Sequence, residues 1–407
     1  MNNQPTLKRR SQLSQTLRPL LSSSFNKGVW TWEVHDDLKS AETLWRGFEQ
    51  EAASYVFQTF DWLYRWVEIV GKPVHFIKPC VVIVWKDSQL LFILPLGIRP
   101  EKGFKILEWL GGIHSDYKGP LIRKKSVTGS LTGIWDFIKK TLPKFDATCL
   151  LKQPAVIDGE SNPCITANPT EQNRAYSIIM EGTWEQYQLT RVSTNLRADS
   201  RRKRRRLGEL GDLKFVVASD HETSKRLTEI MFEQKSRRWS ETGSWNRLAA
   251  KEHRHFYETI TDDLLGNRVV HVSALEIDGI VIATHWGALY RKHFYWLMPT
   301  FEGGKWARYS PGRLLLEYLL EWCFNNGVER FDFTGGAEDY KLEWANHDMP
   351  LYQNCNGNNL KGKLYLQWLQ SSSSVKVKWY GTSSSVKDFV KKSSIGPIIR
   401  RAYDRLR

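Results

Sequence analysis

The strongest local constraint on this chain is a pair of apolar runs joined by the dipeptide Asp278-Gly279. Both residues tolerate a positive φ, so Asp-Gly between two such runs favours a type I′ turn. The runs Val269–Ile277 and Ile280–Tyr290 are therefore predicted to form an antiparallel hairpin. A chain that contains this hairpin contains a β-sheet, which excludes an all-helical fold.

The elements after the hairpin are predicted in the order strand, helix, strand, and this order bears on where a phosphate could bind. Phe294–Met298 is predicted as a third strand, Ser310-Pro311-Gly312 as the start of a helix, and Val328–Phe333 as the strand after it. The helix start would lie beside a strand edge, where free backbone N–H groups and the helix dipole favour a phosphate. The candidate residues for a cofactor pyrophosphate are Arg308, Ser310, Gly312 and Arg313.

The earlier part of the chain predicts a second unit of the same class. Residues 29–180 alternate helix-like and strand-like runs, with two strands near Pro73–Trp85 and Leu90–Ile98. We therefore expect an α/β (α+β) protein with two lobes, each a mixed central sheet flanked by helices. The second lobe is expected over 181–360 and begins with a long helix, 184–210, that joins the two.

The positive charge is concentrated in three segments. The net charge is +15, and the excess lies in residues 1–28, in residues 361–407 and in Arg197–Arg206, which holds seven basic side chains. The two ends are expected to be flexible basic tails. The central run could meet tRNA phosphates, could meet an anionic membrane surface together with the C-terminal tail, or could be a solvated linker helix.

The cysteines and the hydropathy pattern exclude several classes of protein. The five cysteines are scattered without a Cys-x-x-Cys pair, which argues against a zinc site and a disulfide framework and fits a reducing compartment. No apolar run reaches the roughly 20 residues needed to cross a bilayer. We expect a cytoplasmic protein without a metal or a transmembrane segment, and peripheral contact with the inner membrane face stays open.

Five motifs lie in order along the chain: Phe57–Leu63, Gly111–Leu121, Ile282–Gly287, Ser310–Leu315 and Phe331–Lys341. They resemble motifs of the GNAT superfamily of acyltransferases, in particular its BioF-associated, CelD-like (cellulose biosynthesis) branch, which is related to the Fem aminoacyl-transferases. The resemblance spans about residues 29–360. The usual pyrophosphate signature, Arg or Gln followed by x-x-Gly-x-Gly/Ala, is absent.

This resemblance implies that an acyl-CoA donor, and no metal, serves the reaction. The pantetheine arm would lie in a V-shaped gap between the parallel strands Phe294–Met298 and Val328–Phe333. An acceptor amine or hydroxyl would attack the thioester directly. Such chemistry needs a base for the acceptor, an oxyanion donor and an acid for the leaving thiolate.

Candidate side chains for these roles lie near the ends of the expected strands, and each has a plain structural alternative as a packing or solvated residue. Tyr340 would protonate the thiolate, Lys341 would contact a phosphate or carbonyl oxygen as in Fem-type enzymes, and His285 would act as the base. Asp332 and Glu338 are the candidates for orienting an amine. Asp116 and Tyr117 are the candidates for binding the acceptor between the lobes.

The predicted function is therefore acyl transfer to an amino or hydroxyl group of a sugar, glycan, envelope intermediate or small metabolite. A role in polysaccharide biosynthesis follows from the resemblance alone. One alternative is a Fem-like transferase that uses aminoacyl-tRNA, which would bind tRNA in a strongly salt-dependent manner. Another alternative is a non-catalytic GNAT-like binding protein, which would not bind acyl-CoA.

Overall fold

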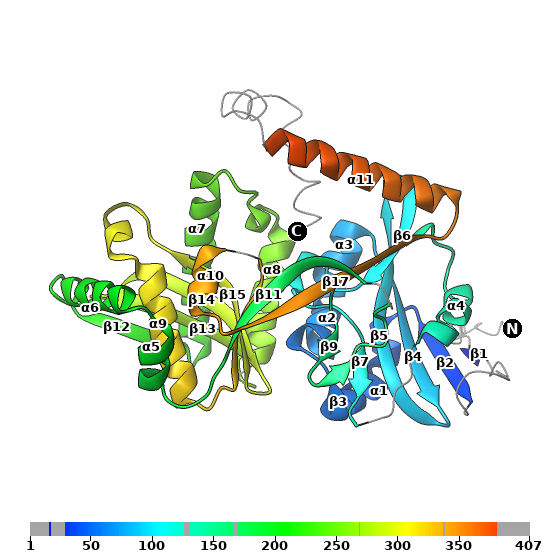
Figure 1. Ribbon diagram of the computed structural model, residues 1–407, viewed down its shortest axis with the longest axis horizontal. Helices are drawn as coiled ribbons and strands as arrows, with labels where there is room; N and C mark the ends of the chain where they lie inside the picture. Colours follow the sequence, from blue (N-terminus) through cyan, green and yellow to red (C-terminus); the bar gives the residue numbers. More distant parts are fainter. Residues whose placement is uncertain are drawn as a thin grey trace, which may run out of the picture.

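The computed structural model describes residues 16–17, 29–125, 131–166, 169–267, 269–336 and 338–380. Figure 1 shows two lobes that lie side by side, with two long strands running between them. This arrangement confirms the predicted α/β class with two lobes, each a mixed sheet flanked by helices. The segments 1–15, 18–28 and 381–407, which make up most of the two expected tails, lie outside the described residues.

The first lobe is a mixed sheet with helices against it. Its strands β4, β5 and β6 are antiparallel, and β6 pairs in parallel with β8 after the helix α4. The strands are β1 (Thr16–Leu17), β2 (Trp30–His35), β3 (Ala52–Ala53), β4 (Lys78–Lys86), β5 (Gln89–Glu101), β6 (Phe104–Trp109), β7 (Leu121–Arg123), β8 (Ala147–Pro154), β9 (Val156–Ile157) and β10 (Glu160–Ser161). The helices are α1 (Leu38–Glu51), η1 (Val56–Gln58), α2 (Phe60–Trp66), η2 (Val67–Gly71), α3 (Lys72–His75), η3 (Gly112–His114) and α4 (Thr132–Thr141).

The second lobe repeats the same order of elements. Its strands β13, β14 and β15 are antiparallel, and β15 pairs in parallel with β16 after the helix α9. The strands are β12 (Leu213–Val217), β13 (Val270–Ile277), β14 (Ile280–Tyr290), β15 (His293–Phe301) and β16 (Arg330–Gly335). The helices are α5 (Trp184–Arg191), α6 (Thr194–Gly208), α7 (His221–Glu241), η4 (Arg247–Ala249), α8 (Lys251–Leu264), η5 (Gly304–Tyr309), α9 (Pro311–Asn325) and α10 (Asp339–Trp344).

Two strands join the lobes through backbone hydrogen bonds. β11 (Thr170–Ile179) pairs with β16 of the second lobe and with β17 (His347–Gly357), and β17 pairs with β8 of the first lobe. Figure 1 shows both strands crossing from one lobe to the other. The two half-sheets therefore form one continuous sheet within the described part of the chain.

Aromatic side chains fill the space between the lobes. The ring of Phe57 meets Tyr295 edge-on at 5.3 Å between centroids, and Trp62 lies 5.4 Å from Phe256 and 6.2 Å from Trp286. All five side chains are buried. Large aromatic rings in edge contact stabilise a packing arrangement beyond their buried area. The lobes therefore hold a fixed geometry around any site that lies between them.

The hairpin prediction is confirmed in detail. Asp278 and Gly279 have φ values of 48° and 78°, as a type I′ turn requires, and Ile277 is paired with Ile280 across it. The flanking runs are β13 and β14, which are nearly all buried. The turn dipeptide and the apolar runs thus correctly predicted both the antiparallel hairpin and the pairing of its two strands at the turn.

The expected single helix over 184–210 is wrong, because two helices, α5 and α6, occupy this stretch. α5 ends at Arg191. The side chain of Ser193 then accepts a hydrogen bond from the backbone N–H of Leu196 at 3.2 Å, which caps a new helix. A serine oxygen in this position competes with continued helix and is among the preferred N-caps.

The expectation of a flexible tail from residue 361 is also wrong for its first part. The helix α11 (Leu360–Tyr380) lies against β17, β8 and β6, and Figure 1 shows it along one side of the first lobe. Its Tyr365 is buried, packs with its ring centroid 5.2 Å from that of Phe104 at an interplanar angle of 44°, and donates to Glu101 at 2.8 Å. Leu366 and Leu369 pack against the same small apolar cluster as Tyr365, and a few such residues among serines and lysines are a weak pattern in sequence.

Candidate active site

The central feature of the second lobe is the divergence of its two parallel strands. β15 and β16 pair only over His293–Tyr295 and Arg330–Asp332, and no pairing between them follows Tyr295 and Asp332 in these described strands. The backbone groups beyond this point face a gap between the strands. Extended chains can add to such exposed strand backbone through hydrogen bonds. The predicted V-shaped gap is therefore present, and it opens at the C-terminal ends of both strands.

Tyr340 lies where the two strands separate. Its ring meets Phe333 of β16 edge-on at 6.1 Å, and its side chain is 37% exposed to solvent. Burial raises the pKa of Tyr340 to about 12, so the phenol carries its proton at neutral pH. This is the state that an acid for a leaving thiolate requires.

Lys341 and Glu338 hold the loop at the end of β16. The Lys341 ammonium donates to the carbonyl of Gly335 at 2.9 Å and forms an ion pair with Glu338 at 2.9 Å. The Lys341 side chain is buried, whereas that of Glu338 is 57% exposed. In this state Lys341 orders the loop beside the gap, and contact with a substrate would require it to exchange one of these partners.

Asp332 is the centre of a buried polar cluster between the lobes. Its Oδ1 accepts hydrogen bonds from the Tyr117 hydroxyl at 2.6 Å and from the Thr334 backbone at 2.7 Å, and its Oδ2 lies 2.8 Å from Nε2 of His293. Burial and the Asp332 carboxylate hold the pKa of Tyr117 well above its ordinary range. The structure thus brings together two residues predicted separately, Tyr117 and Asp332, across the lobe boundary.

His293 was missed by the sequence interpretation, which began the third strand at Phe294. With Nε2 committed to a buried carboxylate, the ring is oriented and its Nδ1 remains for another partner. A carboxylate behind an imidazole is the arrangement that makes a histidine an effective base. The alternation of His293 with Tyr295 along one strand was the only available signal.

Asp116 lies on the same first-lobe loop as Tyr117 but has a different partner. Its carboxylate forms an ion pair with Lys152 at 3.2 Å. Burial alone would raise the pKa of Asp116, but Lys152 and then Lys341 hold it below its ordinary value. Asp116 is therefore a fixed negative charge near the end of β16, where a cationic group would be favoured.

His285 is separated from the other candidates. It is fully buried in β14, and its ring stacks on Trp296 at 4.4 Å with an interplanar angle of 10°. Burial lowers its pKa well below the ordinary value, and neither ring nitrogen has a hydrogen-bond partner in the described protein. This environment is that of a neutral histidine that packs against Trp296. It does not suit a base that contacts the acceptor.

Lys235 of α7 is a second residue that the sequence interpretation missed. Its ammonium donates to the carbonyl of Pro299 at 2.7 Å, on the part of β15 that has left β16. Burial lowers the pKa of Lys235 to about 8, so an appreciable neutral fraction exists slightly above neutral pH. A lysine within a long amphipathic helix gives no signal of this contact.

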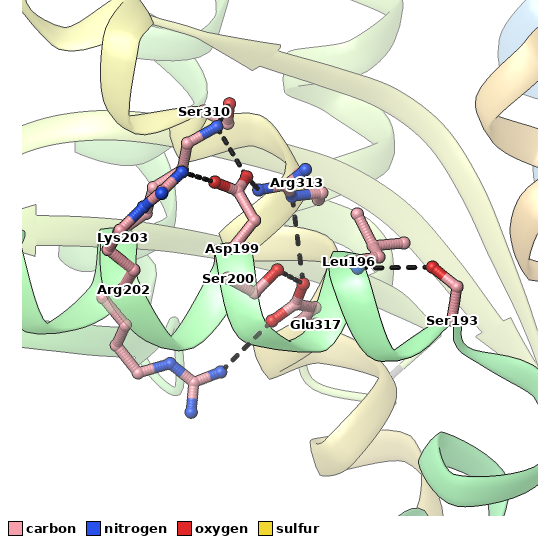
Figure 2. Close-up of polar contacts among 10 residues, drawn as sticks. Ser193, Leu196, Asp199, Ser200, Arg202, Lys203, Ser310, Arg313 and Glu317 are labelled. Atoms are coloured by element: carbon pink, nitrogen blue, oxygen red, sulfur yellow. Dashed lines mark hydrogen bonds and ion pairs between the residues drawn. The ribbon is translucent and has the colours of Figure 1, made fainter.

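The start of α9 is occupied by contacts from α6, as Figure 2 shows. Ser310 adopts a left-handed conformation, with φ 51°, and its hydroxyl accepts a hydrogen bond from Lys203 at 2.8 Å. Arg313 forms an ion pair with Asp199, while Glu317 accepts from Ser200. The charge of Arg313, one of the predicted pyrophosphate residues, is therefore already matched within the protein.

Gly312 has a packing reason for being glycine. A Cβ at this position would lie 2.8 Å from the Phe301 ring. The residue therefore allows α9 to approach the end of β15 closely, whether or not a phosphate binds there.

Two hollows flank the diverging strands. One, of about 300 Å³, lies beside the start of α9 and is lined by Lys203, Arg206, Glu209, Leu210, Arg308 and Tyr309. The other, of about 660 Å³, lies between the lobes at the N-terminal ends of β15 and β16, and His293 and Tyr295 form part of its wall. The diverging strands thus have a basic hollow on one side and a larger cavity of mixed lining on the other.

Within the described residues there is no cluster of side chains suited to a metal ion. Nor does any helix in that part of the chain have the length and apolar character needed to span a membrane.

Part of the chain matches a known protein family, and the fold is similar to those of several solved structures. Residues 194–342 match the family described as Acetyltransferase (GNAT) domain. No curated protein matches this chain. Among solved structures, FemX superposes with a TM-score of 0.52 at 10% identity, over 76% of this chain and 95% of that chain. At this identity the likeness shows the two-lobed fold alone.

Two further solved structures are similar at lower scores. A conserved protein of unknown function from Bacteroides thetaiotaomicron VPI-5482 has a TM-score of 0.49 at 12% identity, over 79% of this chain and 98% of that chain. A tandem GNAT protein from the clavulanic acid biosynthesis pathway has a TM-score of 0.41 at 10% identity, over 81% and 99%. The BioF-associated, CelD-like branch stays a prediction, whereas the match of residues 194–342 to the acetyltransferase (GNAT) domain family supports the acyltransferase class predicted from the sequence.

Proposed function

We propose that this protein transfers an acyl group from acyl-CoA to an amino or hydroxyl group of a sugar, envelope intermediate or other polar metabolite. The observation that carries this proposal is the divergence of β15 and β16 directly after Tyr295 and Asp332. The amide groups of a pantetheine arm can pair with the unpaired strand backbone, and this would bring the thioester to the point where Tyr340 and Asp332 lie.

The basic hollow beside α9 supports a donor with phosphate groups. Arg206 and Arg308 line it, and neither forms an ion pair with any described side chain. Lys203 adds a third cation, although it already contacts Asp199 at 2.9 Å. Cations next to a helix N-terminus form an anion site in which charge-assisted hydrogen bonds contribute most of the affinity.

The reaction itself would need two proton movements. The acceptor nitrogen or oxygen attacks the thioester carbonyl and forms a new C–N or C–O bond, while His293, oriented by Asp332, accepts the proton of the nucleophile. When the tetrahedral intermediate collapses, the C–S bond breaks and Tyr340 gives its proton to the departing thiolate. Positioned acids and bases of this kind contribute about 10²- to 10⁴-fold each.

The first test is a calorimetric titration with acetyl-CoA and a longer acyl-CoA. The variant Arg308→Gln is expected to weaken acetyl-CoA binding by about 10-fold or more, because a hydrogen bond to a charged group contributes about 1.5–3 kcal/mol. Arg205→Gln is the matched control, since Arg205 is exposed on α6 and is paired with Glu209 on its own helix. Its affinity should stay within about twofold.

Replacing Gly312 by a bulky residue is a poor probe of the donor site, because the clash with Phe301 would disturb the protein without any ligand. Equal loss of affinity in both arginine variants would mean that α6 contributes only a diffuse positive field. No saturable binding of either acyl-CoA would contradict the proposed donor.

A second candidate function, transfer from aminoacyl-tRNA, is favoured by one observation. Arg201, Arg202, Arg205 and Arg206 are exposed on α6, which contacts the start of α9. Such a surface would neutralise several phosphates, so tRNA binding should fall steeply as salt rises. Saturable tRNA binding with this salt dependence, in a protein that does not bind acyl-CoA, would shift the assignment to the tRNA-dependent donor. A protein that binds neither would be a non-catalytic relative.

A further inference from the structure

The cavity between the lobes has a wall built from the ends of several strands. Its volume is about 660 Å³, enough for a ligand of the size of a substituted sugar. The wall combines apolar surface with several charged side chains, so a ligand with both an apolar face and polar groups fits it. The residues of the wall that carry a full charge are Asp158, Arg291, Lys292, Glu329, Arg330 and Asp348.

The three acidic residues of this wall are all neutralised by neighbouring cations. Asp158 pairs with Lys124 at 2.7 Å and with Arg291 at 3.6 Å. Glu329 pairs with Lys292 at 2.7 Å. Asp348 pairs with Arg174, which lies outside the wall. Each carboxylate in the wall therefore has its counter-ion before any ligand enters.

Arg330 is the charged residue of the wall that takes part in none of these ion pairs. It is half-buried in the wall, and in the part of the chain that the structure describes its guanidinium has no ion-pair partner. Its register partner on β15 is His293, whose imidazole is held by Asp332. The cavity thus contains a guanidinium without a described ion-pair partner next to the candidate base.

His347 adds a second donor close to Arg330. Its Nδ1 lies 3.3 Å from the Ser177 hydroxyl, and it lines the same cavity. His347 and Arg330 line the same cavity, and the pKa of His347 is lowered first by burial and then by the positive charge of Arg330. Three strands, β15, β16 and β17, therefore direct His293, Arg330 and His347 toward one polar space.

We propose that this cavity binds the acceptor through an anionic group, a carboxylate or a phosphate, which Arg330 holds with His347 beside it. A guanidinium presents a planar set of donors that matches both anions. The naming of the ligand as the acceptor rests on the proposed function, but the anion site itself rests on the unpaired Arg330. The acceptor class is thereby narrowed from polar metabolites to those that carry a negative charge.

The test is a calorimetric titration of the full chain with glucose 6-phosphate, glucuronate and glucose. We expect saturable binding of at least one of the two anionic probes, and at least 10-fold weaker binding of neutral glucose. The comparison of glucose 6-phosphate with glucuronate separates a phosphate ligand from a carboxylate ligand. Arg330→Gln should weaken the preferred anionic probe by at least 10-fold, and Arg330→Lys should give an intermediate loss.

The matched control is Lys292→Gln, which removes a cation of the same wall that is 65% exposed and already paired with Glu329. Its affinity for the anionic probe should change by less than threefold. The inference is overturned if neither anionic probe binds, if glucose binds as tightly as the anions, or if Arg330→Gln and Lys292→Gln behave alike. An acetyl-CoA titration of the same preparation separates the two proposals, because donor binding without anion binding overturns this inference alone.

Discussion

Replacing Asp332 by asparagine is expected to lower kcat for acetyl transfer by about 100-fold or more, while acetyl-CoA affinity stays within about twofold. Three donors converge on the Asp332 carboxylate, from Tyr117, His293 and the Thr334 backbone. Asparagine offers one acceptor oxygen and no charge, so it cannot serve all three or stabilise a protonated His293. Release of the CoA thiol with glucosamine 6-phosphate, an amino acceptor that carries an anionic group, measures the effect.

The control for this prediction is a nucleophile that needs no base. Hydroxylamine is largely unprotonated at neutral pH, so its acetylation should fall much less in Asp332→Asn than that of the amino sugar. Tyr117→Phe removes one of the three hydrogen bonds and should lower kcat by about 10-fold. If Asp332→Asn slows both nucleophiles equally, the cluster maintains the structure of the site and does not assist proton removal.

The elements that could be predicted were those with strong local patterns. The Asp278-Gly279 turn and its flanking strands depend on two residues with a positive φ and on apolar runs that are buried on both faces. The order of strands after the hairpin then placed Tyr340 and Asp332 near the divergence of β15 and β16. The local sequence therefore predicted where the gap between β15 and β16 lies. It did not predict which residues form hydrogen bonds and ion pairs with the side chains around that gap.

The partners could not be predicted because they come from distant parts of the chain. The hydrogen bond between Tyr117 and Asp332 spans 215 residues and depends on the packing of one lobe against the other, to which the strands β11 and β17 and the aromatic rings between the lobes both contribute. Arg313 was expected to meet a pyrophosphate, yet Asp199 of α6 neutralises it. A charge run in sequence shows how many cations are present, but only the packing shows which of them are paired.

The helix α11, which packs on the first lobe, also contacts the strand β17. We expect a large effect on local stability when this helix is released. Tyr365→Ala should release α11 from the first lobe, because it removes a buried ring that packs on Phe104 and a hydrogen bond to Glu101. Removal of a large buried aromatic side chain costs about 3–5 kcal/mol. Amide hydrogen exchange over residues 360–371 should therefore become about 100-fold faster or more, which reports local opening directly.

Leu364→Ala is the matched control, since Leu364 lies on the same helix but is 52% exposed. Exposed substitutions change stability by about 0.5 kcal/mol or less, so exchange should change by no more than a few fold. Because α11 contacts β17 as well as β8, loss of docking in Tyr365→Ala should also speed exchange in β17 before it reaches β15 and β16. If exchange in β17 is unchanged while α11 opens, the helix covers the first lobe without supporting the strand that joins the lobes.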